Sequence, residues 1–317
     1  MTEKQSPEIA GAADALVDDV VVPFQVADTA VRGRLVRLAG GIDDILRPHQ
    51  FPDEVSELVG EATALAAMMG SALKFDGKLI FQAQGDGPVK LVVADFLTSG
   101  DIRAMASFDA GAAPLPRGAA ALLGKGHMAF TIDQGAEMDR YQGVTGLDGD
   151  NLAAMAVAYF AQSEQIPTVV KLAVGRASTL GGDEVWRAGG IMVQFVPDEG
   201  GNAVCGEGVD MDAGDDDVWT RLSAFVETTQ ADELLDPSIS PSTLLLRLFH
   251  EDGVRVFDPV AIRAACGCSG EKIATVLKKY STADLAEMVE DGIITVTCEF
   301  CRAAYRFSPE GVMMDTL

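Results

Sequence analysis

The chain is 317 residues long, and its apolar content of 48% is enough for a conventional hydrophobic core spread over about two domains. Its 24 basic residues are outnumbered by 48 acidic ones, which gives a net charge of -24. Such a charge repels phosphate backbones and anionic lipid surfaces, so we expect neither nucleic acid nor membrane as a partner.

Residues 1–19 form an acidic segment that we expect to be a flexible extension. It lacks the apolar stretch behind a basic start that marks a secretory signal. The longest apolar region, Ala62 to Leu73, is too short to span a bilayer. These patterns predict a cytoplasmic protein, in which clustered cysteines are metal ligands or redox sensors more often than permanent disulfides.

Residues 20–197 alternate between strand-like runs and helical stretches, with glycine-rich turns between them. Several runs alternate apolar and polar residues, as expected for sheets with one covered face. Helices are expected at Glu54 to Leu73 and at Asn151 to Gln165, where apolar residues recur at helical spacing. The expected strands are Phe24 to Val26, Ala30 to Leu38, Lys78 to Gln84, Val89 to Asp95, His127 to Ile132, Tyr141 to Val144, Val169 to Val174 and Ile191 to Phe195. The fold class is therefore α+β, with a mixed N-terminal core domain that is rich in antiparallel sheet.

Residues 198–252 are expected to be an acidic, helical linker, because they contain fourteen acids and only two arginines. The part through Asp217 is rich in Gly and Asp, and we expect it to be a solvated loop. Short helices follow at Val218 to Thr229 and at Pro241 to His250. Helices of this length are marginal in isolation. We therefore expect them to dock on another part of the protein and to be able to undock.

Residues 253–317 make a small C-terminal unit that contains four of the five cysteines. Below roughly 70 to 80 residues a domain usually needs a metal or disulfides to stay folded. The expected elements are two short helices, Glu271 to Tyr280 and Thr282 to Glu290, and a hairpin formed by Ile293 to Thr297 and Ala304 to Phe307. The turn of this hairpin contains Cys298 and Cys301, so the unit is predicted to be a zinc-binding domain.

The four clustered cysteines form two close pairs, Cys266-Gly-Cys268 and Cys298-Glu-Phe-Cys301. Four thiolates from two such pairs can surround one tetrahedral Zn²⁺ ion, so we predict one zinc site per chain. Sites of this kind are commonly structural. A disulfide within the Cys-x-Cys pair would close a small, strained ring with a relatively high reduction potential. The spacing is thus compatible with a structural site and with a reversible redox switch.

Two other functions fit part of the cysteine pattern. A zinc ribbon that binds nucleic acid should have a basic face, but residues 254–317 carry nine acids and seven bases. A thiol-disulfide oxidoreductase would place Cys298 and Cys301 at the start of a helix, whereas here they lie between two strand-like runs. No set of residues resembles a hydrolytic triad or a pair of catalytic carboxylates, so we predict that the protein is not an enzyme.

The other cysteine and the histidines have no recognisable partners in the sequence. Cys205 lies in the acidic loop without a second Cys or a His nearby, and we interpret it as a bystander. His49, His127 and His250 are far apart, and we interpret them as surface or packing residues.

Several short runs occur in a fixed order along the chain: Val31-Arg32-Gly33, Leu73-Lys74-Phe75-Asp76-Gly77, Gln84-Gly85-Asp86-Gly87-Pro88, Arg140-Tyr141-Gln142-Gly143-Val144, Ser163-Glu164-Gln165-Ile166-Pro167, Ala188-Gly189-Gly190 and Leu246-Arg247-Leu248-Phe249-His250-Glu251. Together with the cysteine tail, these runs resemble the redox-regulated heat-shock chaperone family called the 33 kDa chaperonin. The resemblance covers nearly the whole chain. Its specificity comes from the shared order of the runs and from the tail.

The resemblance implies an ATP-independent holdase that is inactive when it is reduced and zinc-bound. It implies that Cys266, Cys268, Cys298 and Cys301 are the zinc ligands. On oxidation it implies Cys266-Cys268 and Cys298-Cys301 disulfides, loss of zinc, an unfolded linker and a homodimer. The active form would bind unfolded or partially folded client proteins and prevent their aggregation.

The chain departs from the family pattern in its N-terminal extension and in a long acidic insert near residues 203–217. Neither departure removes a cysteine of the tail. The linker as a whole carries a net charge of about -12, the difference between fourteen acids and two arginines. This charge repels itself and lowers the cost of undocking. We therefore expect the linker to be a metastable latch, whose threshold depends on the insert.

Overall fold

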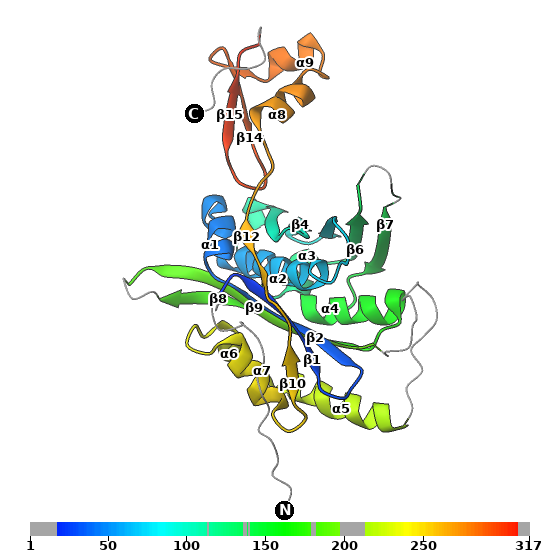
Figure 1. The fold of residues 1–317 in the computed structure, drawn as a ribbon. Coiled ribbons are helices and arrows are strands. Elements are labelled where there is room, and N and C mark those ends of the chain that lie inside the picture. The colour runs from blue at the N-terminus through cyan, green and yellow to red at the C-terminus, as the bar shows by residue number, and fades with distance from the viewer. Residues whose placement is uncertain are drawn as a thin grey trace, which may run out of the picture.

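The computed structural model describes residues 18–112, 114–135, 138, 140–178, 182–196 and 213–309. Its strands form two six-stranded sheets and one small sheet (Figure 1). Sheet A contains β1 (Val20–Val26), β2 (Val31–Leu38), β8 (Thr168–Ser178), β9 (Glu184–Phe195), β10 (Val254–Val256) and β11 (Val260–Ala261). Sheet B contains β3 (Lys78–Gly85), β4 (Val89–Leu97), β5 (Asp101–Phe108), β6 (Gly126–Asp133), β7 (Tyr141–Gly146) and β12 (Arg263–Ala264). Sheet C contains β13 (Val289–Glu290), β14 (Ile293–Thr297) and β15 (Ala304–Phe307).

The strand pairing confirms the expected α+β class with antiparallel-rich sheets. Sheet A has the order β10-β1-β2-β9-β8, with β11 also paired to β1, and all its pairs are antiparallel. Sheet B has the order β12-β5-β4-β3-β6-β7, in which only the β12–β5 pair is parallel. Strand β5 was not among the strands expected from the sequence. Its apolar positions include two alanines and it begins at an acid, so its intrinsic strand signal is weak, and pairing with β4 supplies the rest.

Helix α2 (Asp53–Gly70) lies between sheets A and B and forms the centre of the main core. Thirteen of its residues are buried, which explains why its apolar residues nearly surround the helix. Two glycines allow its close approach to the sheets. A Cβ on Gly60 would lie 2.7 Å from Val174 of sheet A, and a Cβ on Gly70 would lie 2.3 Å from Phe96 of sheet B. The helix thus fastens the two sheets to each other.

The remaining helices of the core are short: α1 (Gly40–Leu46), α3 (Ala119–Leu123) and α4 (Leu152–Tyr159). Helix α4 follows the expected start, because the side chain of Asn151 accepts a hydrogen bond from the backbone N–H of Ala154. The expected continuation to Gln165 is a π-helical turn, Phe160–Glu164. Helix α1 was not expected from the sequence, because its first two residues are glycines, which weaken a helical pattern.

Three linker helices cover the outer face of sheet A: α5 (Ala213–Thr228), α6 (Ala231–Leu235) and α7 (Pro241–Phe249) (Figure 1). The apolar residues Leu222, Leu244 and Phe249 are fully buried against the sheet. Docking of the linker helices is therefore confirmed. The loop expected through Asp217 is wrong from residue 213 onward, because acids in the first turn of α5 stabilise its N-terminus. Residues 203–212 of the acidic insert, and Cys205, lie outside the described residues.

Two buried arginines of sheet A hold the second linker helix. Arg37 donates to the carbonyl oxygens of Asp236 at 2.5 Å and Glu233 at 2.7 Å. Arg187 donates to the carbonyl of Leu235 at 2.8 Å, and its guanidinium pairs with Asp18. Gly189 lies beneath this contact, since a Cβ there would be 2.6 Å from the Leu234 carbonyl. The free carbonyls at the C-terminal end of α6 are thus satisfied by the sheet.

The segment that follows the linker pairs with both sheets of the core. Strands β10 and β11 pair with β1 of sheet A, and β12 pairs with β5 of sheet B. Residues 254–264 therefore run along both sheets of the core and do not belong to the cysteine-bearing unit. Their short strands have little pattern of their own, and tertiary pairing decides their place. We call residues 254–264 the strap.

The cysteine-bearing unit begins after the strap and contains α8 (Gly270–Leu277), α9 (Thr282–Glu287) and sheet C. The hairpin predicted around Cys298 and Cys301 is present as β14 and β15. The helix expected to reach Glu290 is wrong beyond Glu287, because Val289–Glu290 pairs with β14. Among the described residues, no helix of the protein is both long and apolar enough to cross a membrane.

Candidate metal centre

The first cysteine pair lies where the strap ends and α8 begins. The backbone N–H of Ala265 donates to the carbonyl of Ile102 at 2.9 Å, so the residue before Cys266 is still attached to sheet B. After Cys268, the side chain of Ser269 accepts a hydrogen bond from the N–H of Lys272 and caps α8. The Cys-x-Cys pair is therefore held between a strand and a helix start.

The second pair lies in the tight turn between β14 and β15. The N–H of Cys298 donates to the carbonyl of Ala303, and the N–H of Arg302 donates to the carbonyl of Cys298, both at 2.9 Å. Arg302 has a φ of 60°, a left-handed conformation that closes the turn. This geometry turns both side chains of the Cys-x-x-Cys pair to the same side.

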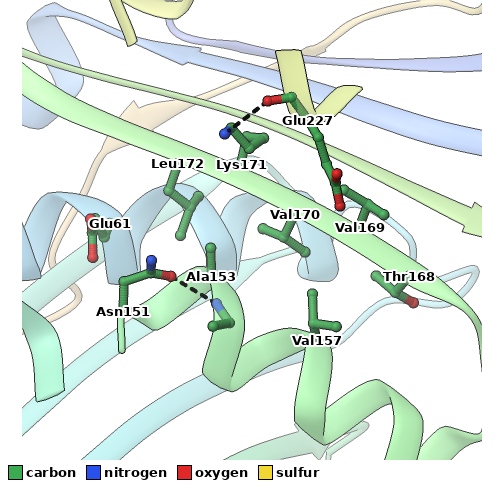
Figure 2. Close-up of a pocket in the computed structure, with 11 residues that line it drawn as sticks. Glu61, Asn151, Ala153, Val157, Thr168, Val169, Val170, Lys171, Leu172 and Glu227 are labelled. Carbon is green, nitrogen blue, oxygen red and sulfur yellow. Dashed lines mark hydrogen bonds between the residues drawn. The ribbon is translucent and has the colours of Figure 1, made fainter. Parts of the chain in front are cut away.

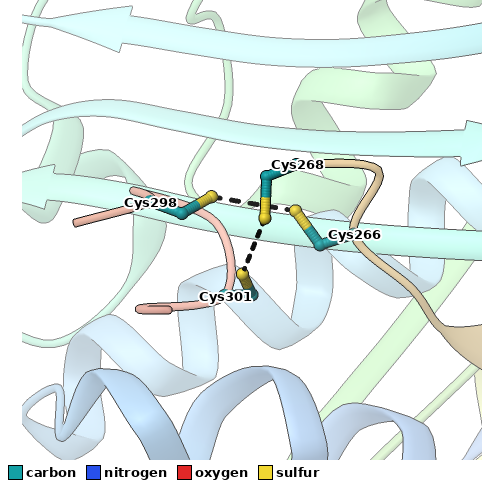
Figure 3. Close-up of side chains that lie close together, drawn as sticks. All are labelled: Cys266, Cys268, Cys298 and Cys301. Atoms are coloured by element: carbon teal, nitrogen blue, oxygen red, sulfur yellow. Dashed lines mark hydrogen bonds between the residues drawn. The ribbon is translucent and has the colours of Figure 1, made fainter. Parts of the chain in front are cut away.

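The four sulfur atoms converge on one point (Figure 3). All four Sγ atoms lie within 4.8 Å of one another. The Sγ atoms of Cys266 and Cys298 are 3.7 Å apart, and those of Cys268 and Cys301 are 3.4 Å apart. A tetrahedral Zn²⁺ ion with Zn–S bonds of about 2.3 Å requires sulfur-sulfur distances of about 3.8 Å. The donor set and its dimensions therefore fit zinc.

The electrostatics of the cluster also indicate a cation. Burial, followed by contacts with the other thiols, raises the pKa of Cys301 to about 12. A hydrogen bond with Cys268 raises the pKa of Tyr305 to about 12, and the Oη of Tyr305 lies 3.1 Å from that Sγ. The charged form of the Cys301 thiol is therefore costly without a counter-charge. A divalent cation at this point would remove that penalty and hold its ligands as thiolates.

One arginine of the core contacts the cluster from outside. Arg103 of β5 donates to the Sγ of Cys266 at 3.8 Å, and its guanidinium lies 3.9 Å from the ring centroid of Phe300. Its Nη2 and Nε atoms donate to the buried carboxylate of Asp95 at 2.6 and 2.9 Å. The guanidinium is therefore fixed in the core and presents positive charge to the thiolate side.

A histidine makes the second contact between the core and the cysteine turn. The Nε2 of His49 lies 2.9 Å from the carbonyl oxygen of Phe300, to which it can donate, and its ring stacks on Phe51 at 4.5 Å. Burial is the main cause that lowers the pKa of His49. The interpretation of His49 as a packing residue thus becomes specific, because it packs at the junction with the cysteine unit. His127 and His250 are exposed, and neither is near the cluster.

Arg103, His49 and Phe300 were not expected from the sequence to be parts of this site. Their separation in the sequence hides the contact, because β5 and the cysteine turn are almost two hundred residues apart. The only local signal was Phe300 itself, an aromatic residue inside a Cys-x-x-Cys turn.

Comparisons with known proteins agree with this arrangement over nearly the whole chain. The sequence model of the family described as "Hsp33 protein" matches residues 19–308. The chain belongs to the Hsp33 family. The 33 kDa chaperonin of Caulobacter vibrioides (strain NA1000 / CB15N) is 49% identical over 303 residues, which cover 93% of this chain and 97% of that protein. The 33 kDa chaperonin of Shewanella sediminis is 35% identical over 288 residues, covering 90% of each chain.

A solved Hsp33 structure has the same fold. The crystal structure of the 33 kDa chaperonin of Thermotoga maritima superposes with a TM-score of 0.74, at 21% identity, covering 93% of this chain and 96% of that one. Hsp33 proteins are redox-regulated holdase chaperones and not enzymes, and this chain carries a four-cysteine cluster. Unfolded proteins are accordingly its partners.

Proposed function

We propose that Cys266, Cys268, Cys298 and Cys301 hold one Zn²⁺ ion in the reduced, inactive chaperone. The observation that carries the proposal is the convergence of four sulfur atoms at distances that suit tetrahedral coordination. When bound, the ion supplies the positive charge that keeps the four ligands as thiolates. Such a reduced resting state suits the cytoplasm, where we place the protein.

Oxidation by a peroxide would convert the four cysteines into two disulfides. Each disulfide forms from two thiolates, one H₂O₂ molecule and two protons taken from water, and releases two water molecules, so the complete reaction consumes two peroxides. No thiolate then remains to bind a metal ion. Because the small unit depends on that ion, loss of the ligands unfolds it.

We propose the pairing Cys266-Cys268 and Cys298-Cys301, although the sulfur contacts of 3.7 and 3.4 Å join the two motifs across the cluster (Figure 3). The contacts across the cluster exist only while the unit is folded. Once it unfolds, the partners nearest in sequence have the higher effective concentration. Peptide mapping of the oxidised protein by mass spectrometry distinguishes the two pairings.

The strap provides the route from the cluster to the linker. It connects Cys266 to the end of α7 and pairs with both core sheets. In β10, Val254 pairs with Val26 of β1, and both residues belong to the apolar cluster that the linker helices cover. If the cysteine unit unfolds, β12 loses its anchor at one end. The self-repelling acidic linker then has less to hold it against sheet A.

Undocking would uncover the apolar surface between sheet A and α5–α7. On the sheet this surface includes the fully buried residues Val22, Phe24 and Leu35, and on the linker it includes Leu222 and Leu244. An exposed apolar surface of this kind binds unfolded chains, and it can also join two copies of the protein. We therefore propose that oxidation yields a homodimer that prevents the aggregation of partially folded clients.

The decisive experiment follows metal release and activity in the same samples. Purified reduced protein is treated with peroxide at mildly raised temperature, while released zinc is measured with a chromogenic chelator and free thiols are counted. Suppression of aggregation of a thermally unfolding test protein should rise in step with zinc release. Zinc loss without any gain in aggregation suppression would contradict the proposed switch.

A further inference from the structure

Strand β8 is an edge strand, because only β9 pairs with it among the described residues. The register identifies which of its backbone groups face outward. The N–H of Phe195 donates to the carbonyl of Pro167, so in this antiparallel pair residues 169, 171 and 173 also bond to β9. The N–H and C=O groups of Val170, Leu172 and Val174 therefore point away from the sheet. They make no hydrogen bond to any residue that the structure describes.

A cleft of about 680 Å³ runs beside this edge (Figure 2). Residues 168–172 of β8 form one side, and α4 forms the opposite side through Ala153, Ala154 and Val157. Glu61 of α2 and Asn151 lie at one end. Unpaired strand edges attract a further strand, and proteins usually cover them. Here the part of the chain that the structure describes leaves the edge beside the cleft.

The linker closes the third side of the cleft. Glu227, near the end of α5, lines it, and the Nζ of Lys171 donates to the carbonyl oxygen of Glu227 at 3.1 Å. Helices α5 and α6 both contact β8. When the linker undocks, as the proposed function requires, the cleft loses this wall. Access to the edge is thus tied to the redox state through the linker.

We propose that the outward edge of β8 binds an extended segment of an unfolded client as an additional strand of sheet A. Main-chain hydrogen bonds to Val170, Leu172 and Val174 would hold the segment without reading its sequence, which suits a chaperone with many clients. Alternate side chains of the segment would face Val157 and Ala153, so apolar residues at every second position are favoured. This inference rests on the proposed function, since it names the client site of the activated form.

The test uses a substitution that removes one outward N–H. Leu172→Pro deletes a donor that takes no part in the ladder to β9, a position where edge strands tolerate proline. Leu172→Ala is the matched control, because it shortens the same side chain and keeps the N–H. After full oxidation, we expect Leu172→Pro to bind reduced, carboxymethylated α-lactalbumin, a permanently unfolded chain, about tenfold more weakly than Leu172→Ala. Equal affinities for the two variants would overturn the proposal.

A second measurement does not depend on the folding of a proline variant. Amide hydrogen exchange of the oxidised wild-type protein is followed by NMR with and without the same unfolded chain. We expect the amides of Val170 and Leu172 to become protected when the chain is added, while those of Lys171 and Ala173, already bonded to β9, change little. Protection that appears without added chain would assign the edge to a second copy of the protein and overturn the client site. Failure of oxidised wild type to bind the unfolded chain at all would instead contradict the proposed function.

Discussion

The two-sheet core and the cysteine-bearing unit are folded by different means. In the core, α2 packs between two sheets and buries a continuous set of apolar residues from both. In the cysteine unit, five apolar side chains are buried among the described residues: Ala274, Leu277, Ile294, Tyr305 and Phe307. Each Å² of buried apolar surface contributes about 25 cal/mol, which is enough to stabilise the large core but not the small cysteine unit. This difference supports the proposal that oxidation unfolds the cysteine unit and leaves the core intact.

Removal of the metal should have the largest effect on this contrast. With a strong chelator under reducing conditions, we expect residues 266–309 to lose nearly all amide exchange protection, because zinc contributes about 10–16 kcal/mol in comparable small units. The amides of α2 should remain protected. Hydrogen exchange with mass spectrometry measures both regions in one sample. A Cys205→Ser variant should behave as wild type, and persistent protection of residues 266–309 would show that the unit folds without metal.

Loss of a buried aromatic ring should lower the free energy of unfolding in the core, whereas in the cysteine unit it should lower the affinity for zinc. Phe81→Ala in sheet B should lower the free energy of unfolding of the core by about 3–5 kcal/mol. Phe307→Ala in sheet C removes a ring of the same size that is 1% exposed, but there folding and metal binding are coupled. We expect it to raise the zinc Kd by about a hundredfold and to leave the melting of the core unchanged. Tyr280→Ala, an exposed ring of the same unit, should change neither quantity.

Loss of the arginine that holds α6 should weaken the docking of the linker on sheet A. Arg37→Met removes two charge-assisted bonds to carbonyls and leaves those carbonyls without partners, which should weaken linker docking by about 2 kcal/mol. We expect faster amide exchange across residues 231–249 in the reduced protein, and activation at a lower peroxide dose. Arg247→Met removes the same charge from the exposed side of α7 and serves as the control. Similar amide exchange rates in both variants would mean that net charge, and not the hydrogen bonds from Arg37 to α6, controls docking of the linker.

Loss of the contact between the core and the cysteine turn should have the smallest effect. Phe300→Ala removes the ring that lies against Arg103, and an interaction of this kind stabilises docking by about 1 kcal/mol. We expect zinc affinity to stay unchanged and the cysteine turn to be oxidised a few times faster, as measured by thiol trapping. Phe257→Ala is the control, since that ring lies against Arg255 and its backbone N–H donates to the carbonyl of Pro23 on β1. A large loss of zinc affinity would show that Phe300 supports the metal site itself.

Much of the fold and of the site could be predicted because the signals were local. The strands of β2, β3 and β6 have alternating patterns, α2 has helical periodicity, and two short cysteine pairs indicate a tetrahedral site wherever the chain brings them together. The parts that could not be predicted have weak local signals. Strand β5 is rich in alanine, α1 begins with glycines, and the strap consists of strands of two or three residues.

The sequence by itself predicted the four-cysteine cluster, because four thiols in two close pairs favour a tetrahedral metal site without knowledge of the rest. It also determined that the linker helices must dock, because their apolar faces are too small to be stable alone. Only the tertiary structure decided that residues 254–264 belong to the core and that Arg103 and His49 contact the cysteine turn. The physical reason is distance along the chain: such contacts depend on sheet pairing between segments more than a hundred residues apart, and no local pattern encodes that pairing.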